Sequence, residues 1–198
     1  MAFRGRGWLV CGLLGVGSGG CERVETWFGE PQAEVQAPLR HDEDGVSFAY
    51  PGNWSLREEP GATAEIDLHT LVLASRGDAL MLLQVFRPAV VIDLDEHLEL
   101  TMRTLIADFA GRGGGVGEVV PGPVTTFERA WLGAPRQARR AAIHVVMPGE
   151  EADRAIELHA ARLPACTVVV FTMVPEGGQA QAGAGFDLVL DTLAIAAD

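Results

Sequence analysis

Lysine is missing from this chain of 198 residues, so all 15 of its basic side chains are arginines. A Schiff base, a pyridoxal-phosphate linkage, a phosphate-loop lysine and a lysine general base all need an ammonium side chain. The sequence therefore excludes these chemistries. The basic residues are outnumbered by 27 acidic ones, which gives a formal net charge of −12. This excess of negative charge argues against sequence-independent binding of nucleic acid, because such binding needs cations that displace counterions from phosphates.

The start of the chain differs from the rest. Arg4 and Arg6 form a short basic head, and residues 7–20 then carry no charge around an apolar centre. This stretch is too short to cross a bilayer as a helix, which takes about 20 apolar residues, so its layout is that of a secretory signal. Its small residues run directly into Cys21 and resemble the end of a bacterial lipoprotein signal, although Ser18 stands where leucine is usual. The alternatives are a plain cleaved signal and no signal at all.

In the lipoprotein pattern, Cys21 becomes the acylated first residue of the mature chain. Each buried methylene contributes about 0.8 kcal/mol, so more than one acyl chain makes the attachment durable. Removal of residues 1–20 leaves 13 basic against 27 acidic side chains, a net charge of −14. Residues 21–44 are polar and lack a sustained periodicity, which predicts a flexible tether before a folded domain at residues 45–198. We therefore expect an exported protein, lipid-anchored in the bacterial cell envelope on its periplasmic or outer surface.

Short apolar runs predict the first strands of the domain. Residues 46–50 alternate and then meet the turn signal Pro51-Gly52-Asn53, after which a second strand begins. Residues 66–74 and 79–86 are apolar runs on either side of residues 75–78, and this arrangement predicts a hairpin. The Arg-Gly-Asp sequence within this turn matches a cell-adhesion tripeptide. Glycine followed by aspartate is also ordinary turn chemistry, and we favour that interpretation.

Residues 93–111 give the clearest helical pattern, with apolar side chains recurring every three or four residues on one face. Asp93, Asp95 and Glu96 stand at its start, where carboxylates favour the free amides and the positive end of the helix dipole. We interpret this acidic group as a cap, because it lacks the glycine and the spacing of a calcium loop. The glycine-rich residues 111–117 follow a helix instead of a strand, so we expect a helix stop and a loop there, not a phosphate loop.

Four further strands and a helix complete the predicted domain. They are expected at residues 124–132, 136–147, 154–163 and 166–174, with the helix at residues 179–194. Consecutive strands joined by short turns imply antiparallel pairing with separate helices, hence an α+β fold. We expect an antiparallel β-sheet of about six to seven strands covered by helices.

The hairpin of the two long strands suggests one candidate site. A symmetric register places Ile143 opposite Ala160 and makes one face entirely apolar. The other face then carries His144 beside His159, with Glu157 nearby. Two imidazoles and a carboxylate could hold a divalent transition metal. The alternative is a pair of half-exposed histidines bonded to neighbouring charged groups or water, and we assign no metal to them.

Three segments carry a resemblance to a known family. They are Phe48-Ala49-Tyr50-Pro51-Gly52-Asn53-Trp54, the helix entry Asp93-Leu94-Asp95-Glu96-His97-Leu98, and Phe186-Asp187-Leu188-Val189-Leu190-Asp191-Thr192-Leu193. Through them, the part of the chain from about residue 45 to residue 196 resembles the PsbP-like family, which also includes the DcrB-type bacterial lipoproteins. The resemblance implies an antiparallel sheet covered by helices. It also implies a binding or accessory role without a shared catalytic site.

The remaining reactive residues predict no catalytic site. The sequence has no Gly-x-Ser-x-Gly, His-Glu-x-x-His or Cys-x-x-Cys motif. Cys166, the only cysteine outside the signal and the anchor, precedes an apolar run, so we expect a buried inert thiol and no disulfide. Arg136, Arg139 and Arg140 form the one basic cluster. A docking patch for an acidic partner is one interpretation of it, and contact with the chain's own carboxylates is the one we favour.

We therefore expect a non-enzymatic, membrane-anchored lipoprotein that acts as a binding or accessory module for a protein or envelope assembly. Its partners would be the membrane, through Cys21, and a protein, with no cofactor and no nucleic acid. One alternative is a small metal-dependent or hydrolytic enzyme that uses the His144/His159 face, and another is a purely structural envelope protein. A deep pocket with converging histidines and carboxylates would favour the enzyme, whereas a shallow apolar patch would favour partner binding.

Overall fold

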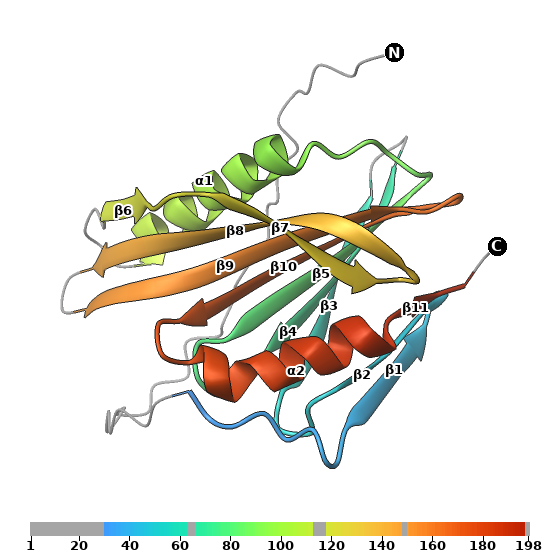
Figure 1. The fold of residues 1–198 in the computed structure, drawn as a ribbon, viewed down its shortest axis with the longest axis horizontal. Coiled ribbons are helices and arrows are strands. Elements are labelled where there is room, and N and C mark those ends of the chain that lie inside the picture. Colours follow the sequence, from blue (N-terminus) through green and yellow to red (C-terminus); the bar gives the residue numbers. More distant parts are fainter. Residues whose placement is uncertain (1–29, 63–65, 113–117, 148–149, 197–198) are drawn as a thin grey trace.

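The computed structural model describes residues 30–62, 66–112, 118–147 and 150–196. Its elements run in the order β1 (Leu39–Glu43), β2 (Val46–Tyr50), β3 (Ser55–Ala62), β4 (Asp67–Ala74), β5 (Leu80–Arg87), α1 (Leu94–Arg112), β6 (Glu118–Pro121), β7 (Thr125–Trp131), β8 (Ala134–Met147), β9 (Glu150–Arg162), β10 (Thr167–Pro175), α2 (Gln179–Thr192) and β11 (Ala194–Ile195). Figure 1 shows how these elements are arranged.

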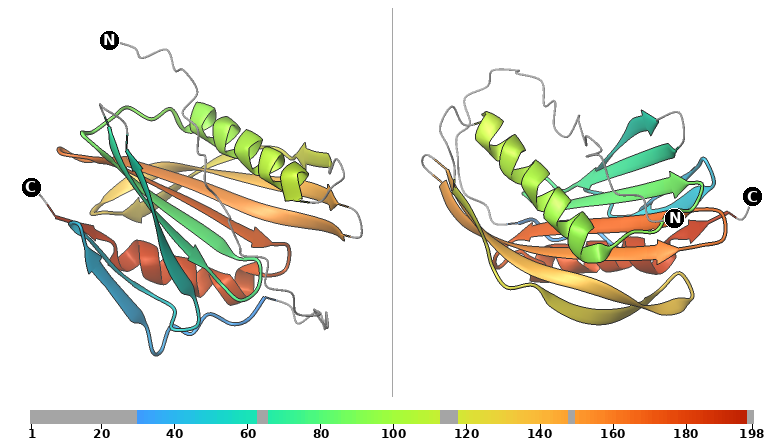
Figure 2. Two further views of the ribbon diagram at one scale, coloured as in Figure 1. Left: turned by 180° about the vertical axis from the view of Figure 1, so that it is seen from behind. Right: turned by 90° about the horizontal axis from the view of Figure 1, so that it is seen from above.

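The strands form two antiparallel sheets. The large sheet has the order β3-β4-β5-β10-β9-β8-β6, with β7 also paired to β8, and the small sheet has the order β1-β2-β11. The α+β class and the antiparallel pairing are therefore confirmed. The large sheet has eight strands and exceeds the expected size. Figure 2 shows it strongly twisted, as antiparallel sheets of L-residues are.

The large sheet is buried on both faces because α1 and α2 lie on opposite sides of it (Figure 2). Neighbouring side chains along β4, β5 and β10 alternate between two apolar clusters, as the pleat of a strand requires. The cluster under α2 and the small sheet contains Val46, Trp54, Leu71, Leu83, Val168, Val170, Phe186 and Val189. The cluster under α1 contains Leu98, Met102, Ile143, Ile156, Leu158, Val169 and Phe171. Burial on both faces explains why residues 166–174 read as one continuous apolar run.

The predicted register of β8 and β9 is wrong by six residues. Ile143 lies opposite Arg154 and not opposite Ala160. The predicted strand begins at residue 154 because residues 150–153 are acidic and polar, whereas β9 begins at Glu150. Side chains alternate with a period of two, so a slip by an even number leaves every residue on its predicted face. Ile143 and Ile156 accordingly still belong to one buried cluster.

The described part of the predicted tether is folded against the domain, which is a second correction. Residues 39–43 form β1, which pairs with β2, and only His41 of this strand is buried. Further upstream, the Ala33 amide donates to the Gln181 carbonyl of α2 at 3.0 Å. The folded part therefore includes residues 30–44. A strand with one buried residue, and that one a histidine, lacks the apolar alternation on which the prediction depended.

The helix entry and the first hairpin turn are as predicted. Asp93 Oδ1 accepts hydrogen bonds from the amides of Asp95 and Glu96 at 2.9 and 3.0 Å, so it caps α1. The Arg-Gly-Asp sequence lies at the β4–β5 turn, which is closed by the Ser75 amide donating to the Ala79 carbonyl at 3.0 Å. Residues 113–117 of the glycine-rich segment lie outside the described residues. Among the described helices, none is long and apolar enough to cross a membrane.

Candidate functional site

The histidine pair suggested by the sequence does not form. His144 lies opposite Asp153, with its Nδ1 2.7 Å from Asp153 Oδ1, and His159 lies opposite Ala138. The two histidines are six positions apart along the sheet, about 20 Å at the usual rise of a strand. The slip in register described above is the reason. Over the described residues, no group of three or more His, Cys, Asp or Glu side chains could hold a metal ion.

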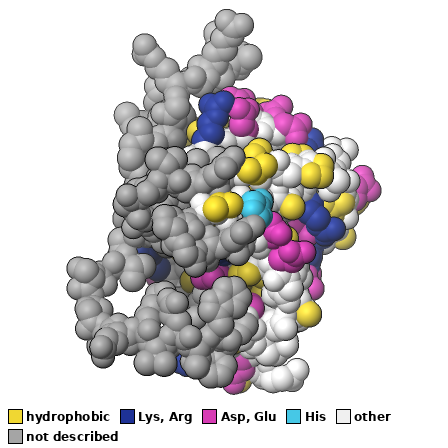
Figure 3. Space-filling model, turned by 90° about the vertical axis from the view of Figure 1, so that its left-hand side faces the viewer, with side chains coloured by type: hydrophobic (Ala, Val, Ile, Leu, Met, Phe, Trp, Pro, Cys, Tyr) yellow, Lys and Arg dark blue, Asp and Glu magenta, His cyan; other side chains and the backbone are white. Residues whose placement is uncertain are grey.

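His144 lies in the half-exposed environment that the alternative interpretation predicts. Figure 3 faces the end of the molecule where β6 and β8 lie side by side, and it shows hydrophobic side chains beside a histidine and acidic residues. Val120, opposite His144 in β6, is 46% exposed, and Val146 is 37% exposed. Hydrogen bonding to His144 lowers the pKa of Asp153 below its usual value. This is a small solvent-accessible ion pair on an apolar surface.

His159, in contrast, is a core residue. It is fully buried, and the rings of Phe127 and Trp131 pack edge-on against it with centroids 5.6 and 6.0 Å away. Its Nε2 lies 3.4 Å from Glu157 Oε2, but neither ring nitrogen has a hydrogen-bond partner of good geometry among the described residues. We interpret the contact with Glu157 as electrostatic.

Glu157 connects this buried histidine to the surface. Arg140 donates to Glu157 Oε1 from Nε at 2.9 Å and from Nη2 at 2.6 Å, and its guanidinium also lies 4.7 Å from the centre of the Phe127 ring. Burial alone would raise the pKa of Glu157, but His159 and Arg140 outweigh that effect and lower it. Glu157, Arg140, His159 and Phe127 thus connect β7, β8 and β9. We assign these four residues a structural role.

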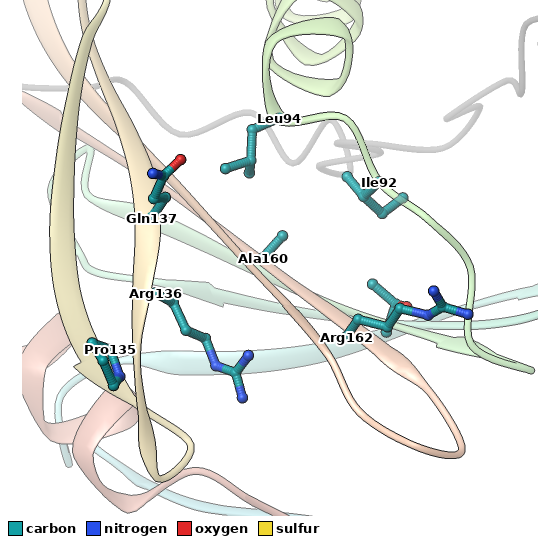
Figure 4. A pocket seen from close by; sticks show the side chains of 8 residues that line it. Ile92, Leu94, Pro135, Arg136, Gln137, Ala160 and Arg162 are labelled. Atoms are coloured by element: carbon teal, nitrogen blue, oxygen red, sulfur yellow. The ribbon is translucent and has the colours of Figure 1, made fainter.

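An open cavity of about 290 Å³ lies on the α1 side of the large sheet (Figure 4). The segment before α1 and the first residue of that helix form one wall, while the start of β8, the end of β9 and the start of β10 form the others. The lining residues are Ile92, Leu94, Pro135, Arg136, Gln137, Ala160, Arg162 and Thr167. Apolar side chains and the guanidinium of Arg162 border this cavity, whereas the Arg136 side chain lies on the other face of β8, the face that its partner Arg129 shares with α2. This cavity is the candidate functional site.

The wall before α1 is held in place by one buried hydroxyl. Thr167, which is 1% exposed, accepts a hydrogen bond from the Val90 amide at 3.0 Å and donates one to the Val90 carbonyl at 2.6 Å. The hydroxyl thus satisfies both backbone groups of a residue outside any regular element. Asp93 then starts α1 three residues further on. Together these bonds fix Ile92 and Leu94 over the sheet.

Arg136 and Arg162 differ from the other arginines nearby. Arg139 and Arg140 bind Asp95 and Glu157, as the sequence led us to expect. Arg136 instead donates from Nε to the Trp131 carbonyl at 3.3 Å. Within the described ranges, no carboxylate lies within 4.0 Å of the guanidinium of Arg136 or of Arg162. At the cavity, the guanidinium of Arg162 is therefore a cation that could receive an external anion.

Sequence reasoning found only part of this cavity. Arg136 belonged to the predicted basic cluster, but Arg162 stood alone at the end of a strand. Ile92 and Leu94 were expected only to lead into a helix. The cavity depends on the start of β8 meeting the end of β9 and on the segment before α1 crossing over both. No local sequence pattern predicts that these segments lie together. The predicted lipidation site, Cys21, lies outside the described residues.

The comparisons with known proteins give only distant similarity. No protein-family model matches the chain, and no curated protein matches it significantly. Among solved structures, the cyanobacterial PsbP protein CyanoP from Synechocystis sp. PCC 6803 is similar with a TM-score of 0.47 and 13% identity, over 90% of this chain and 99% of that chain. LpqN of Mycobacterium tuberculosis, described as involved in cell envelope biogenesis, gives a TM-score of 0.40 and 12% identity, over 81% and 90%.

A third structure, the Ran-binding protein Mog1p of Saccharomyces cerevisiae, gives a TM-score of 0.36 and 12% identity, over 75% of this chain and 84% of that chain. The first of the three is a PsbP protein, the family that the aromatic-proline motif suggested. At these scores the membership of this chain in that family stays a prediction.

Proposed function

We propose that this protein is a non-enzymatic binding module, held at a membrane by an acylated Cys21, that serves a protein or envelope assembly. The cavity between α1 and the large sheet carries the proposal. Its eight lining residues include no histidine, cysteine or carboxylate, and its one hydroxyl, that of Thr167, is occupied by Val90. What it offers a ligand is positive charge, hydrogen-bond donors and apolar surface. These are the means of binding and not of acid–base or nucleophilic catalysis.

The N-terminal contacts bear on how the domain would stand at a membrane. Glu30 Oε2 accepts hydrogen bonds from the amides of Asp78 and Ala79 at 2.9 and 3.0 Å, which fixes the chain to the β4–β5 turn. Cys21 lies nine positions before Glu30. A chain of that length spans at most about 30 Å. An acylated Cys21 would therefore hold the domain close to the bilayer, on a shorter tether than the sequence suggested.

Membrane attachment is tested by replacing the cysteine. Cys21→Ser is expected to move the protein from the membrane fraction to the aqueous fraction of cells, because it removes the acyl chains. Cys166→Ala is the matched control, since Cys166 is buried in the domain and should leave the protein in the membrane fraction. Retention of the Cys21→Ser protein in membranes after a high-salt wash would contradict the anchor.

Partner binding is tested by capture from detergent-solubilised membranes. We expect a stoichiometric protein partner to be recovered with the wild-type chain and with Arg57→Gln, and to be lost with Arg162→Gln. Arg57 lies on β3 and already pairs with Glu59, so its replacement controls for the loss of one charge. Isolation of the wild-type protein as a monomer, or equal recovery with both variants, would contradict binding through the cavity.

The metal-dependent form of the enzyme alternative depended on His144 and His159 lying opposite one another. The structure places them opposite Asp153 and Ala138 instead. Failure to capture any partner would favour the other alternative, a purely structural role in the envelope.

A further inference from the structure

We propose that one end of the large sheet is a docking surface for an acidic segment of the protein partner. The surface, which we call the arginine rim, consists of three arginines and the exposed apolar tips of two loops, namely Arg87, Arg136, Arg162, Val91, Pro164 and Ala165. This inference rests on the proposed function, since it names the chemistry of the partner and extends the contact from the cavity to the end of the sheet.

The three arginines lie at the same end of neighbouring strands. Arg87 is the last residue of β5, Arg162 is the last residue of β9, and Arg136 lies near the start of β8. The order β5-β10-β9-β8 spreads them over three strand spacings, about 14 Å. Figure 1 shows this end on the right, with the β7–β8 turn, the β9–β10 turn and the segment before α1. The guanidinium groups of Arg136 and Arg162 point apart (Figure 4), so they belong to a surface and not to one pocket.

The domain itself does not neutralise the charge of the rim. Within the described residues, no carboxylate lies within 4.0 Å of the guanidinium groups of Arg87, Arg136 and Arg162. Main-chain carbonyls hold two of them, since Arg87 Nη2 donates to the Asp44 carbonyl at 3.0 Å and Arg136 Nε donates to the Trp131 carbonyl at 3.3 Å. A carbonyl orients a guanidinium group and leaves its charge in place.

Other arginines of the domain have acidic partners. Those that pair with a carboxylate are Arg57, Arg103, Arg129, Arg139, Arg140 and Arg154. In a chain with a net charge of −12, three cations left without such partners at one end make that end locally attractive to anions.

Most acidic side chains near the rim are engaged elsewhere. Asp93 Oδ1 caps α1, and Asp187 and Asp191 of α2 accept from Arg129. Asp67 is the exception, because it lies opposite Arg87 in the β4–β5 register and screens that arginine in part. We therefore expect Arg136 and Arg162 to contribute more to binding than Arg87.

The apolar part of the rim comes from two loops that lie side by side. The Thr167 hydroxyl binds both backbone groups of Val90, which holds the segment before α1 next to the β9–β10 turn. Val91 in that segment is 79% exposed, and Pro164 and Ala165 in the turn are exposed as well. Apolar side chains among cations suit a protein segment that carries both carboxylates and apolar residues.

The place of the anchor favours a protein over a lipid surface as the occupant. Glu30 is bonded to the β4–β5 turn, directly before β5, whereas Arg87 ends that strand. Eight residues of strand separate the two by about 23 Å, so the chain from Cys21 enters the domain at the end opposite the rim. The tips of the rim are also a valine, a proline and an alanine, without the aromatic or long apolar side chains that bury well in a bilayer.

Titration with three matched peptides tests the chemistry of the partner. The probes are the acetylated and amidated peptide Glu-Leu-Glu-Gly-Glu-Leu-Glu and its versions with glutamine or lysine in place of glutamate. They are added to the full chain in phosphatidylcholine nanodiscs, and the amide signals of Val91 and Ala165 report binding. The glutamate peptide should shift these signals saturably and at lower concentration than the glutamine peptide, and the lysine peptide should not bind. Equal affinity for the glutamate and glutamine peptides, or no saturable shift, would overturn the proposal.

Replacement of single arginines tests the assignment of the surface. Arg136→Gln and Arg162→Gln should each weaken binding of the glutamate peptide by about two- to fivefold, the usual effect of losing one exposed ion pair, and Arg87→Gln should have a smaller effect. Arg76→Gln is the matched control, because Arg76 is an exposed arginine at the β4–β5 turn, away from the rim. Unchanged affinity in both Arg136→Gln and Arg162→Gln, with thermal unfolding intact, would refute the rim. A loss confined to Arg162→Gln would limit binding to the cavity and refute it equally.

Salt and vesicles provide two measurements that need no variant of the rim. Raising the salt concentration to about 0.5 M should weaken binding of the glutamate peptide, because screening shortens the reach of exposed charges. The Cys21→Ser protein should not sediment with phosphatidylglycerol vesicles. Sedimentation that depends on Arg136 and Arg162 would instead assign the rim to anionic lipid and overturn the proposal.

The failure of this inference and that of the proposed function are distinguishable. A protein that is released from membranes by Cys21→Ser, and that captures its partner through Arg162 but does not distinguish glutamate from glutamine peptides, would keep the binding role and lose only the rim. A protein that stays in membranes after Cys21→Ser but binds the glutamate peptide through the rim would keep the rim and lose the anchor.

Discussion

Arg139 and Asp95 join the large sheet to the start of α1 through two hydrogen bonds. Nε of Arg139 donates to Asp95 Oδ1 at 2.6 Å, and Nη2 donates to Oδ2 at 3.2 Å. The hydrogen bond with Asp95 raises the pKa of Arg139, and the same bond lowers the pKa of Asp95. Bidentate pairs of this kind fix geometry as well as charge. The pair thus holds Leu94, and with it one wall of the cavity, at a defined position over β8.

Loss of this pair should loosen the entry to α1. Asp95→Asn is expected to speed amide hydrogen exchange in the first turn of α1 and to leave exchange in α2 unchanged, because only the former depends on the contact with Arg139. Glu96→Gln is the control, since it removes a carboxylate from the same helical turn without touching Arg139. Equal effects of the two variants would mean that the helix dipole, and not the contact with the sheet, is responsible.

Glu157 should contribute to stability in neutral solution and lose that contribution in acid. Its folded-state pKa is lowered, so the stabilisation is present above its ordinary pKa of about 4.5 and disappears as pH falls through the lowered value. Glu157→Gln should cost about 1 kcal/mol of unfolding free energy at pH 7, and less at pH 3. Urea unfolding at both pH values checks this. A deficit that stays the same in acid would show that packing, and not charge, causes it.

Protonation of His97 should destabilise the folded state. Burial lowers its pKa below the ordinary value of 6.5, and its ring packs edge-on against Phe86 with centroids 6.5 Å apart. The unfolded chain therefore takes up its proton first, and the folded state loses stability as pH falls below about 6.5. His97→Leu removes the titrating group, so the unfolding free energy of the variant should rise relative to that of the wild type between pH 7 and pH 5. Parallel pH profiles of the two proteins would contradict it.

Two glycines of α2 offer a matched pair of substitutions. A Cβ on Gly185 would lie 2.7 Å from Trp54 Cζ2 and 2.8 Å from Pro51 Cγ, whereas a Cβ on Gly183 would meet nothing within 4 Å. Gly185→Ala should therefore destabilise the fold by about 1–3 kcal/mol through overpacking. Gly183→Ala should stabilise it by about 0.5–1 kcal/mol, the helix preference of alanine over glycine. Thermal unfolding distinguishes the two, and similar shifts would contradict the packing described.

The contact at Gly185 also shows what the sequence could predict. The Tyr50-Pro51-Gly52-Asn53-Trp54 segment was recognisable as a strand that ends in a turn, because its residues carry local turn chemistry. Its packing against α2 follows from no local pattern, although Trp54 and Phe186 stack edge-on with centroids 5.2 Å apart. Most strands and both helices were predictable in the same way, since their apolar period or their capping residues are local properties.

The parts that could not be predicted depend on pairing or on single contacts. β1 has only His41 buried, and β6 and β11 are short strands at sheet edges, so none has a readable period. The β8–β9 register was missed because the acidic residues of β9 resemble a turn. The cavity was missed for the same kind of reason. Its residues come from four segments, and only the three-dimensional fold brings Leu94, Gln137 and Arg162 to one site.

Site-specific photocrosslinking in intact membranes tests the central claim most directly. A photoreactive amino acid at Gln137, on the cavity, should give a discrete adduct with the partner, and the same amino acid at Arg57, on β3, should give none. The adduct at residue 137 should disappear when Arg162→Gln is added. The absence of an adduct from the cavity position, or equal adducts from both positions, would contradict a binding module that acts through this cavity.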